Sequence, residues 1–130
     1  MKLYAVIMLG GAIGSALRFL AASSIDRWSG VLFPWGTVTV NILGSFIIGL
    51  FTGLTGPEGP FSVSATLRAF VTIGILGGFT TFSSFSLQTM LLWQEGNYWH
   101  AAGNVLLSVT VCLLATGLGL TIAQHGWKAH

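Results

Sequence analysis

Residues 64–93 read SATLRAFVTIGILGGFTTFSSFSLQTMLLW and form the longest apolar stretch of the chain. Arg68, near its start, is the only charged residue among these 30. A continuous α-helix of this length would extend about 45 Å at 1.5 Å per residue, whereas the hydrocarbon core of a bilayer is about 30 Å thick. The stretch can therefore cross a membrane and still leave residues for an interruption.

The middle of this stretch is a poor continuation of a helix. Gly77 and Gly78 are followed by two β-branched threonines and a run of hydroxyl side chains that ends at Ser86, and glycine and threonine have low helix propensity. We expect a break near residues 77–81, with two half-helices that meet near the membrane midplane. Unwound backbone is tolerated there only inside protein or beside a cavity, where its carbonyls can coordinate a cation. A kinked helix with glycines for packing is the alternative.

Charged residues are scarce along the whole chain. Only eight of the 130 residues are Lys, Arg, Asp or Glu, and 53% are hydrophobic, whereas a soluble domain of this size would carry about 32 charges. This composition excludes a soluble globule and a disordered chain. Five dispersed Lys and Arg residues also argue against nucleic acid as a partner. The single cysteine, Cys112, permits no internal disulfide.

The apolar stretches between the charges predict four transmembrane helices in one domain, residues 1–130. The expected spans are residues 3–22, 32–54, 64–93 and 100–123, and each can cross the hydrocarbon core. The connectors have compositions typical of turns: Asp26-Arg27-Trp28-Ser29-Gly30, Gly56-Pro57-Glu58-Gly59-Pro60 and Glu95-Gly96-Asn97. The expected fold class is an all-α membrane protein. A signal peptide is the alternative for the first span, and the three later spans argue against it.

Orientation in a membrane follows the Lys and Arg content of the connecting segments, which is nearly balanced here. One side would hold Lys2, Arg68 and Lys128, and the other would hold Arg18 and Arg27. Either one charge fixes a single orientation, or the chain inserts both ways up and pairs as an antiparallel dimer. Charge counting leaves these two interpretations equal.

Small residues recur at a spacing of four in two of the expected spans. Gly10 and Gly14 lie in the first span, and Ser45, Gly49 and Gly53 lie in the second. This spacing lets helix backbones approach closely. The stripes would serve packing within one chain and assembly of an oligomer equally well. The small interior of four helices favours an oligomer.

Several side chains in the spans depart from a plain lipid-facing pattern. Asn41 lies within the second span, where an amide needs a partner or water. Phe82 and Phe85 share a face of the second half-helix. A polar stripe on the fourth span repeats every four residues: Asn104, Ser108, Cys112 and Thr116. The alternatives are hydroxyls that bond back to their own helix and phenylalanines that only pack.

The polar groups inside the spans are neutral hydrogen-bond donors. The expected spans contain no Asp or Glu, which removes the usual carrier for proton-coupled transport. Their middles contain no Lys or Arg to pair with a large anion. Amides, hydroxyls and the electropositive edges of aromatic rings remain. Such a lining suits a small, hard anion that is bound weakly enough to leave again. Fluoride fits best, and the chemistry alone leaves chloride or a neutral solute open.

Three motifs resemble those of the Fluc (CrcB) family of fluoride channels. They are Gly10-Gly11-x-x-Gly14-x-x-x-Arg18, Pro34-Trp35-Gly36-Thr37 with Asn41-x-x-Gly44, and Gly77-Gly78-Phe79-Thr80-Thr81-Phe82-Ser83-Ser84-Phe85-Ser86. The resemblance covers nearly the whole chain, and the third motif is highly specific. It implies an antiparallel, dual-topology homodimer in the bacterial inner membrane. Two pores would export fluoride passively and lower its cytoplasmic concentration.

The resemblance also implies roles for individual residues. A central Na⁺, structural and not transported, would be bound by the backbone carbonyls of Gly77 and Thr80 from each subunit. Arg18 would stand at a pore mouth and attract anions, and a snorkelling structural arginine is the alternative. Ring edges and hydrogen-bond donors would line the fluoride pores, and they would come from Asn41, Phe82, Phe85, Ser83, Ser84, Ser108 and Thr116.

Two positions depart from the family pattern. Cys112 replaces a common hydroxyl residue, and a thiol is a weaker donor. Gln88 stands where many relatives have Glu, which puts a charge in the vestibule in doubt.

Two other classes compete with a fluoride channel. A small multidrug exporter is also a four-span, dual-topology dimer. Its mechanism resembles one that needs a membrane-embedded Glu in the first helix, and the first span of this chain contains none. A non-transporting assembly subunit would account for the glycine stripes but not for donors beside a broken helix. An enzyme is not expected, because no base and nucleophile pair within the spans.

Overall fold

The computed structural model describes residues 1–128, and of Trp127 and Lys128 it describes the backbone alone. Its elements are α1 (Lys2–Ser29), α2 (Trp35–Thr55), α3 (Ala65–Ala69), the π-helix η1 (Phe70–Leu76), α4 (Gly77–Phe79), α5 (Phe82–Gln94) and α6 (Tyr98–Lys128). Four segments are long and apolar enough to cross a membrane: Lys2–Ser29, Trp35–Thr55, Ala65–Gln94 and Tyr98–Gly126. The predicted all-α architecture with four candidate spans is confirmed. The side chain of Lys128, which enters the predicted charge balance, lies outside the described part.

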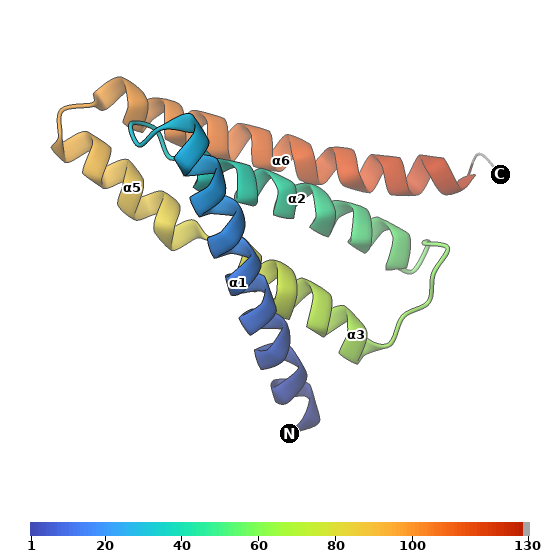
Figure 1. Cartoon of the computed structure of the whole chain (residues 1–130). Helices are drawn as coiled ribbons and strands as arrows, with labels where there is room; N and C mark the ends of the chain where they lie inside the picture. Colours follow the sequence, from blue (N-terminus) through green and yellow to red (C-terminus); the bar gives the residue numbers. More distant parts are fainter. Residues whose placement is uncertain (129–130) are drawn as a thin grey trace.

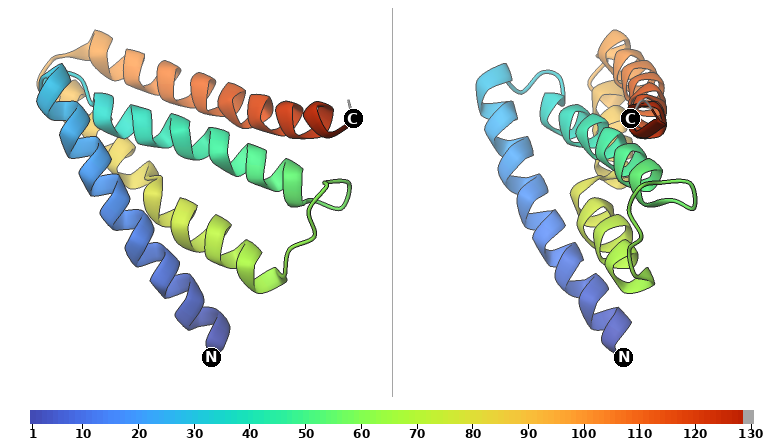
Figure 2. Two further views of the ribbon diagram at one scale, coloured as in Figure 1. Left: turned by 45° about the vertical axis from the view of Figure 1, so that its right-hand side comes forward. Right: turned by 90° about the vertical axis from the view of Figure 1, so that its right-hand side faces the viewer.

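The helices form a splayed bundle (Figures 1 and 2). α2 and α6 lie side by side along most of their lengths and make the most extensive contact between elements. α1 crosses the bundle steeply and packs on η1 and α4. The third candidate span, α3 to α5, passes between these two groups. The middle of this span therefore contacts both α1 and α2.

The first helix is longer than predicted. The sequence places Asp26 and Arg27 in a connector, but α1 continues to Ser29, so that part of the prediction is wrong. The physical reason is that the Asp26 carboxylate has a partner across the connector. It accepts a hydrogen bond of 2.7 Å from the Gly36 N–H in the first turn of α2. A carboxylate at a helix N-terminus is favourable, and the contact joins the end of α1 to the start of α2.

The other two connectors lie where the sequence predicts them. Residues 56–64 separate α2 from α3, and the Arg68 guanidinium donates to the Thr55 carbonyl at the C-terminal end of α2. Residues 95–97 join α5 to α6, where Gly96 has a φ of 79°. This left-handed conformation favours glycine.

The predicted small-residue stripes pack within the chain. A Cβ atom on Gly14 would overlap the carbonyl oxygen of Ile75, so α1 and η1 are in backbone contact there. On the other side of the bundle, a Cβ atom on Gly49 would overlap the Thr116 carbonyl oxygen of α6. The glycines of these stripes therefore form two close helix contacts within the monomer itself.

The backbone of the third span changes form three times before α5 begins. It widens into the π-helix η1, returns to α-helical form at Gly77, and becomes extended at Thr80 (φ −85°, ψ 159°) and Thr81 (φ −153°, ψ 111°). The extended residues are thus two of the five in the range 77–81. Gly77 and Gly78 remain helical, and a Cβ atom on Gly78 would lie 2.6 Å from the Gly11 carbonyl oxygen of α1. Gly78 therefore serves helix packing, whereas the β-branched threonines take the extended conformation that suits them.

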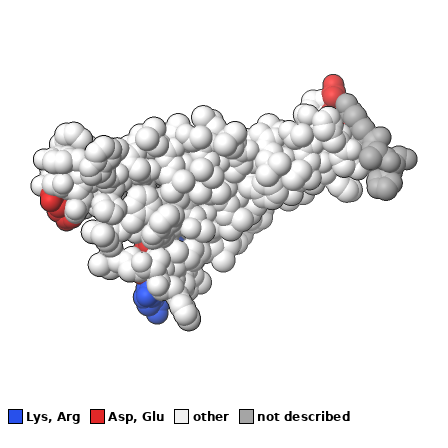
Figure 3. Space-filling model, turned by 90° about the horizontal axis from the view of Figure 1, so that it is seen from above, with Lys and Arg blue, Asp and Glu red and all other residues white. Residues whose placement is uncertain are grey.

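The outside of the molecule is predominantly apolar. Seen from above, most of the surface carries no charge, and the charged residues in view gather near its edges (Figure 3). Large apolar side chains are exposed along every candidate span, for example Phe19 at 73% and Leu114 at 66%. Exposed Trp28 and Trp99 lie within two residues of helix ends, the position that interfacial aromatic residues take in a membrane.

Candidate functional site

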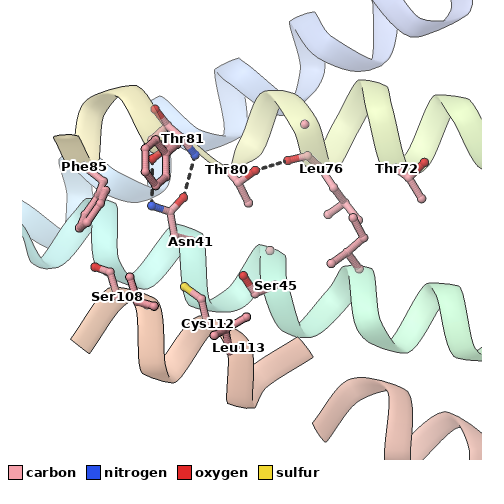
Figure 4. Close-up of a pocket in the computed structure, with 15 residues that line it drawn as sticks. Asn41, Ser45, Thr72, Leu76, Thr80, Thr81, Phe85, Ser108, Cys112 and Leu113 are labelled. Carbon is pink, nitrogen blue, oxygen red and sulfur yellow. Dashed lines mark hydrogen bonds between the residues drawn. The ribbon is translucent and has the colours of Figure 1, made fainter. Parts of the chain in front are cut away.

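Asn41 of α2 pairs with the extended backbone of the third span. Its side-chain Nδ2 donates to the Thr81 carbonyl at 3.0 Å, and its Oδ1 accepts from the Thr81 N–H at 2.7 Å. Figure 4 shows both bonds. One amide thus satisfies both polar groups of a backbone residue that has left the helix, as burial in a membrane requires. The second N–H of the Asn41 amide remains for another acceptor.

The Thr81 side chain begins α5. Its Oγ1 accepts from the Ser84 N–H at 3.2 Å, donates to the Ser84 hydroxyl at 3.0 Å, and lies 3.4 Å from the Ser83 hydroxyl. A threonine that caps a helix N-terminus stabilises it by about 1 kcal/mol. Ser83 and Ser84 therefore belong to a hydroxyl cluster at the start of α5. The N-terminus of a helix also carries partial positive charge, so the cluster is electrostatically suited to an anion.

The interruption removes the helical donors of several backbone carbonyls, those of Gly77 and Thr80 among them. In a continuous α-helix the N–H groups of Thr81 and Ser84 would donate to the carbonyls of Gly77 and Thr80. Here those N–H groups donate to Asn41 Oδ1 and Thr81 Oγ1. The carbonyls of Gly77 and Thr80 are the two that the sequence assigns to Na⁺. The donor set fits that ion, because unwound backbone carbonyls coordinate Na⁺ in membrane proteins. Within the described chain, the Thr80 carbonyl also accepts a long bond of 3.4 Å from Arg18 Nη1.

A cavity of about 460 Å³ adjoins the interruption. Its wall comes from α2, the third span and α6 (Figure 4). Six of the residues that the sequence assigns to Na⁺ or the fluoride pore line it together: Asn41, Gly77, Thr80, Phe82, Phe85 and Ser108. Cys112 lines it as well, so the thiol lies beside the other candidate groups and not apart from them.

The two phenylalanines of the motif are in contact but differ in exposure. Their ring centroids lie 5.3 Å apart with planes inclined by 54°. Phe85 is buried, at 8% exposed, whereas Phe82 is 76% exposed at the open side of the cavity. The pair therefore presents one fixed ring and one ring that remains available to a further surface.

A chain of hydrogen bonds leads from the cavity toward α5. The Ser108 hydroxyl donates to Asn104 Oδ1 at 3.3 Å, the Asn104 amide donates to the Thr89 hydroxyl at 2.9 Å, and that hydroxyl donates to the Phe85 carbonyl at 2.7 Å. Asn104 is fully buried. Thr89 was not among the predicted site residues. Its position four residues after Phe85, on the same helix face, is the signal that could have identified it.

Three residues predicted for the fluoride pore lie apart from the cavity wall. Ser83 and Ser84 stand in the hydroxyl cluster at the start of α5, and the Thr116 hydroxyl donates at 3.0 Å to the Ser45 carbonyl of α2. Thr116 therefore joins α6 to α2 at the contact made by Gly49. The predicted stripe of four on α6 thus divides: Ser108 and Cys112 line the cavity, Asn104 bonds Thr89 of α5, and Thr116 bonds α2.

Gln88 lies one turn beyond Phe85, in a second hollow. Among the described residues its side-chain oxygen, Oε1, is buried without a hydrogen-bond partner. The hollow is bounded by the α1–α2 connector and the end of α5, with Asp26 and Glu95 in its wall. A neutral amide thus shares this hollow with two carboxylates, those of Asp26 and Glu95.

Residues 5–120 match the family model described as CrcB-like protein, Camphor Resistance (CrcB). The match includes every element that contributes to the cavity. This chain belongs to the CrcB family. Membership and four candidate spans together make it a multi-pass membrane protein.

Named relatives of this CrcB chain match over nearly its whole length. A protein of Opitutus terrae called "Fluoride-specific ion channel FluC" is 55% identical over 119 residues, which are 92% of this chain and 90% of the relative. Proteins with the same name from Methylocella silvestris and Rhodospirillum rubrum are 52% and 49% identical. The match to the Methylocella silvestris protein covers 92% of both chains, and the match to the Rhodospirillum rubrum protein covers 89% of this chain and 90% of the relative.

Proposed function

We propose that the protein is a fluoride-selective ion channel of the cytoplasmic membrane, which lets fluoride leave the cell passively and is not an enzyme. The observation that carries the proposal is the Asn41–Thr81 pair beside the cavity, because it holds a helix N-terminus, an amide and two phenylalanine rings around one space. The shared name of relatives about 50% identical supports the same ion.

The chemistry of the lining favours a small anion. The free N–H of Asn41, the Ser108 hydroxyl and the edges of Phe82 and Phe85 would replace part of the hydration shell of fluoride. None of these groups carries a formal charge, so binding would be weak enough for release, which conduction requires. The residues Ser83, Ser84 and Thr116 extend the proposed set along the third and fourth spans. Larger halides would gain less from the same donors, because their charge is more diffuse.

We place the conducting unit in an antiparallel homodimer with two pores. The 76% exposed Phe82 ring beside an open cavity supports a site completed by a second copy. The near balance of Lys and Arg between the two sides supports insertion both ways up. Reporters fused to the C-terminus should then be active on both faces of the membrane, and a single orientation for all molecules would contradict the dimer.

A structural Na⁺ would be bound at the interruption by the carbonyls of Gly77 and Thr80. Bound there, the ion would supply positive charge to oxygen atoms that have lost their helical partners. The chain's own residues do the rest: Asn41 fixes the backbone of Thr81, and Thr81 caps α5. These two contacts thereby fix the positions of the Gly77 and Thr80 carbonyls, although the helix is interrupted beside them.

Ion efflux from liposomes tests the proposed activity. Purified protein should release fluoride much faster than chloride from liposomes loaded with either salt, and empty liposomes set the baseline. Fluoride flux at the baseline, or equal flux of both ions, would overturn the proposal. The same preparation should be dimeric by crosslinking in the membrane.

A further inference from the structure

The glycine contact of α1 brings a positive charge to the interruption. Gly10, Gly14 and Arg18 are spaced by four residues, so they lie on one face of α1. The two glycines press this face against η1 and α4. One turn later Arg18, which is partly buried, extends its guanidinium to the Thr80 carbonyl at 3.4 Å. Because α1 continues to Ser29, Arg18 lies well inside the helix and not at its end.

The Thr80 carbonyl is also one of the two proposed to bind Na⁺. Its oxygen has two lone pairs, and the usual helical donor, the Ser84 N–H, is bonded to Thr81 Oγ1. The oxygen can therefore accept a hydrogen bond and coordinate a cation at once. The guanidinium carries a positive charge, so a positive charge faces this oxygen.

From this shared oxygen we infer that Arg18 sets the affinity of the interruption for Na⁺, and sets it low. The inference rests on the Na⁺ site proposed above. Two positive charges on one oxygen repel each other, and at an effective dielectric of about 20 the repulsion lowers affinity by about tenfold to a hundredfold. The coupling is reciprocal: bound Na⁺ weakens the contact of Arg18 with Thr80 and turns the guanidinium toward other acceptors, including an anion near the cavity.

A Na⁺ titration of purified dimer tests the inference without measuring transport. Thermal unfolding is followed while Na⁺ replaces N-methyl-D-glucamine at constant ionic strength, since a ligand of the folded state raises the melting temperature according to its Kd. Arg18→Gln should lower the apparent Kd for Na⁺ by about tenfold or more. Arg18→Lys keeps the charge and should stay near the wild-type value.

Arg27→Gln is the matched control. Arg27 lies on α1 and on the same side of the predicted charge balance as Arg18, so both variants remove one charge from that side. The Nε atom of Arg27 donates to the Ser23 carbonyl at an exposed position. The Kd of the Arg27→Gln variant for Na⁺ should therefore equal the wild-type value. An unchanged or higher Kd for Arg18→Gln, or an equal decrease in both Gln variants, would overturn the inference.

A second measurement is made on the wild-type chain and covers an Arg18→Gln variant that fails to fold. The ¹⁵Nε resonance of Arg18, assigned by its absence in Arg18→Lys or by segmental labelling, should shift as Na⁺ is added, while that of Arg27 should not. If added Na⁺ raises the melting temperature of the dimer but does not shift the Arg18 resonance, the coupling is refuted and the Na⁺ site is not. A wild-type dimer with no Na⁺ protection would refute the Na⁺ site as well, and fluoride efflux would still test the channel.

Discussion

The third span meets its neighbours in two different ways. Against α1 it is held by backbone contact at glycines, with no room for a methyl group at Gly14. Against α2 it is held by two hydrogen bonds from Asn41, next to a cavity of about 460 Å³. One side is closed and rigid, and the other has open space and spare donors. The difference separates a contact that maintains the fold from a contact that can bind an ion.

The largest effect is expected on the closed side. Gly14→Ala would place a methyl group on the Ile75 carbonyl oxygen, where neither backbone can yield. Overpacking of this kind costs about 3 kcal/mol or more, so little folded protein should be recovered from the membrane. Size-exclusion chromatography in detergent would measure the yield of dimer.

Gly11→Ala provides the control for this contact. Among the described residues, a Cβ atom on Gly11 meets no atom within 4 Å, and alanine raises helix propensity by about 1 kcal/mol. The variant should fold at least as well as wild type. Equal yields of Gly14→Ala and Gly11→Ala would show that the backbone contact is not essential.

A smaller loss of stability is expected on the open side. Asn41→Ala leaves the N–H and carbonyl of Thr81 without partners, which costs about 2–4 kcal/mol for two groups. Thermal unfolding in detergent should report a lower melting temperature and a protein that still folds. Asn97→Ala, in the α5–α6 connector, removes an asparagine away from the interruption and should leave the melting temperature nearly unchanged. A melting temperature of Asn41→Ala equal to that of wild type would contradict the pairing.

The two phenylalanines should respond differently to replacement by isoleucine. Phe85 is buried and Phe82 is exposed, so Phe85→Ile should lower stability by about 1–2 kcal/mol and Phe82→Ile by much less in the monomer. Fluoride flux should fall in both variants without dissociation of the dimer, because an aliphatic side chain has no electropositive ring edge. Preserved flux in both would assign the rings to packing alone.

The smallest effect is expected at the hydrogen-bond chain behind the cavity. Ser108→Ala removes one bond of 3.3 Å to Asn104, which contributes about 0.5–1.5 kcal/mol. Thr121→Val is the comparison, because the Thr121 hydroxyl only bonds back to the Gly117 carbonyl at an exposed position. If the Thr121 variant lowered the melting temperature or fluoride flux more than the Ser108 variant, the buried chain of hydrogen bonds would contribute no more than an exposed hydroxyl.

The open side is also where the sequence was least able to predict the structure. Lengths of apolar runs predicted four candidate spans, because the membrane sets a simple length rule. The Thr81 pairing was not predictable, since hydrophobic periodicity along one span does not say which backbone groups an amide on another span will meet. The glycine spacing at Gly10 and Gly14 predicted close contact but not the partner, which proved to be η1.

Two contacts between helices were not predictable from one helix alone. Asp26 appeared to be a connector residue because charge suggests solvent, yet its carboxylate bonds the first turn of α2 and α1 continues past it. Thr116 keeps the spacing of four with Ser108 and Cys112, and its hydroxyl meets the Ser45 carbonyl of α2, a partner that this spacing does not reveal. Spacing along one helix fixes the face of a residue, and only the crossing of helices fixes what that face meets.

The most direct test of the account is the initial rate of fluoride efflux from liposomes that contain equal amounts of folded Asn41→Ala or wild-type dimer. Loss of a hydrogen bond to an anion, about 1.5–3 kcal/mol, should lower the rate by about tenfold to a hundredfold. Gly11→Ala, which keeps the interruption intact, should conduct like wild type. Equal fluoride rates for Asn41→Ala and wild type would contradict the claim that the Asn41–Thr81 pair forms part of the fluoride pathway.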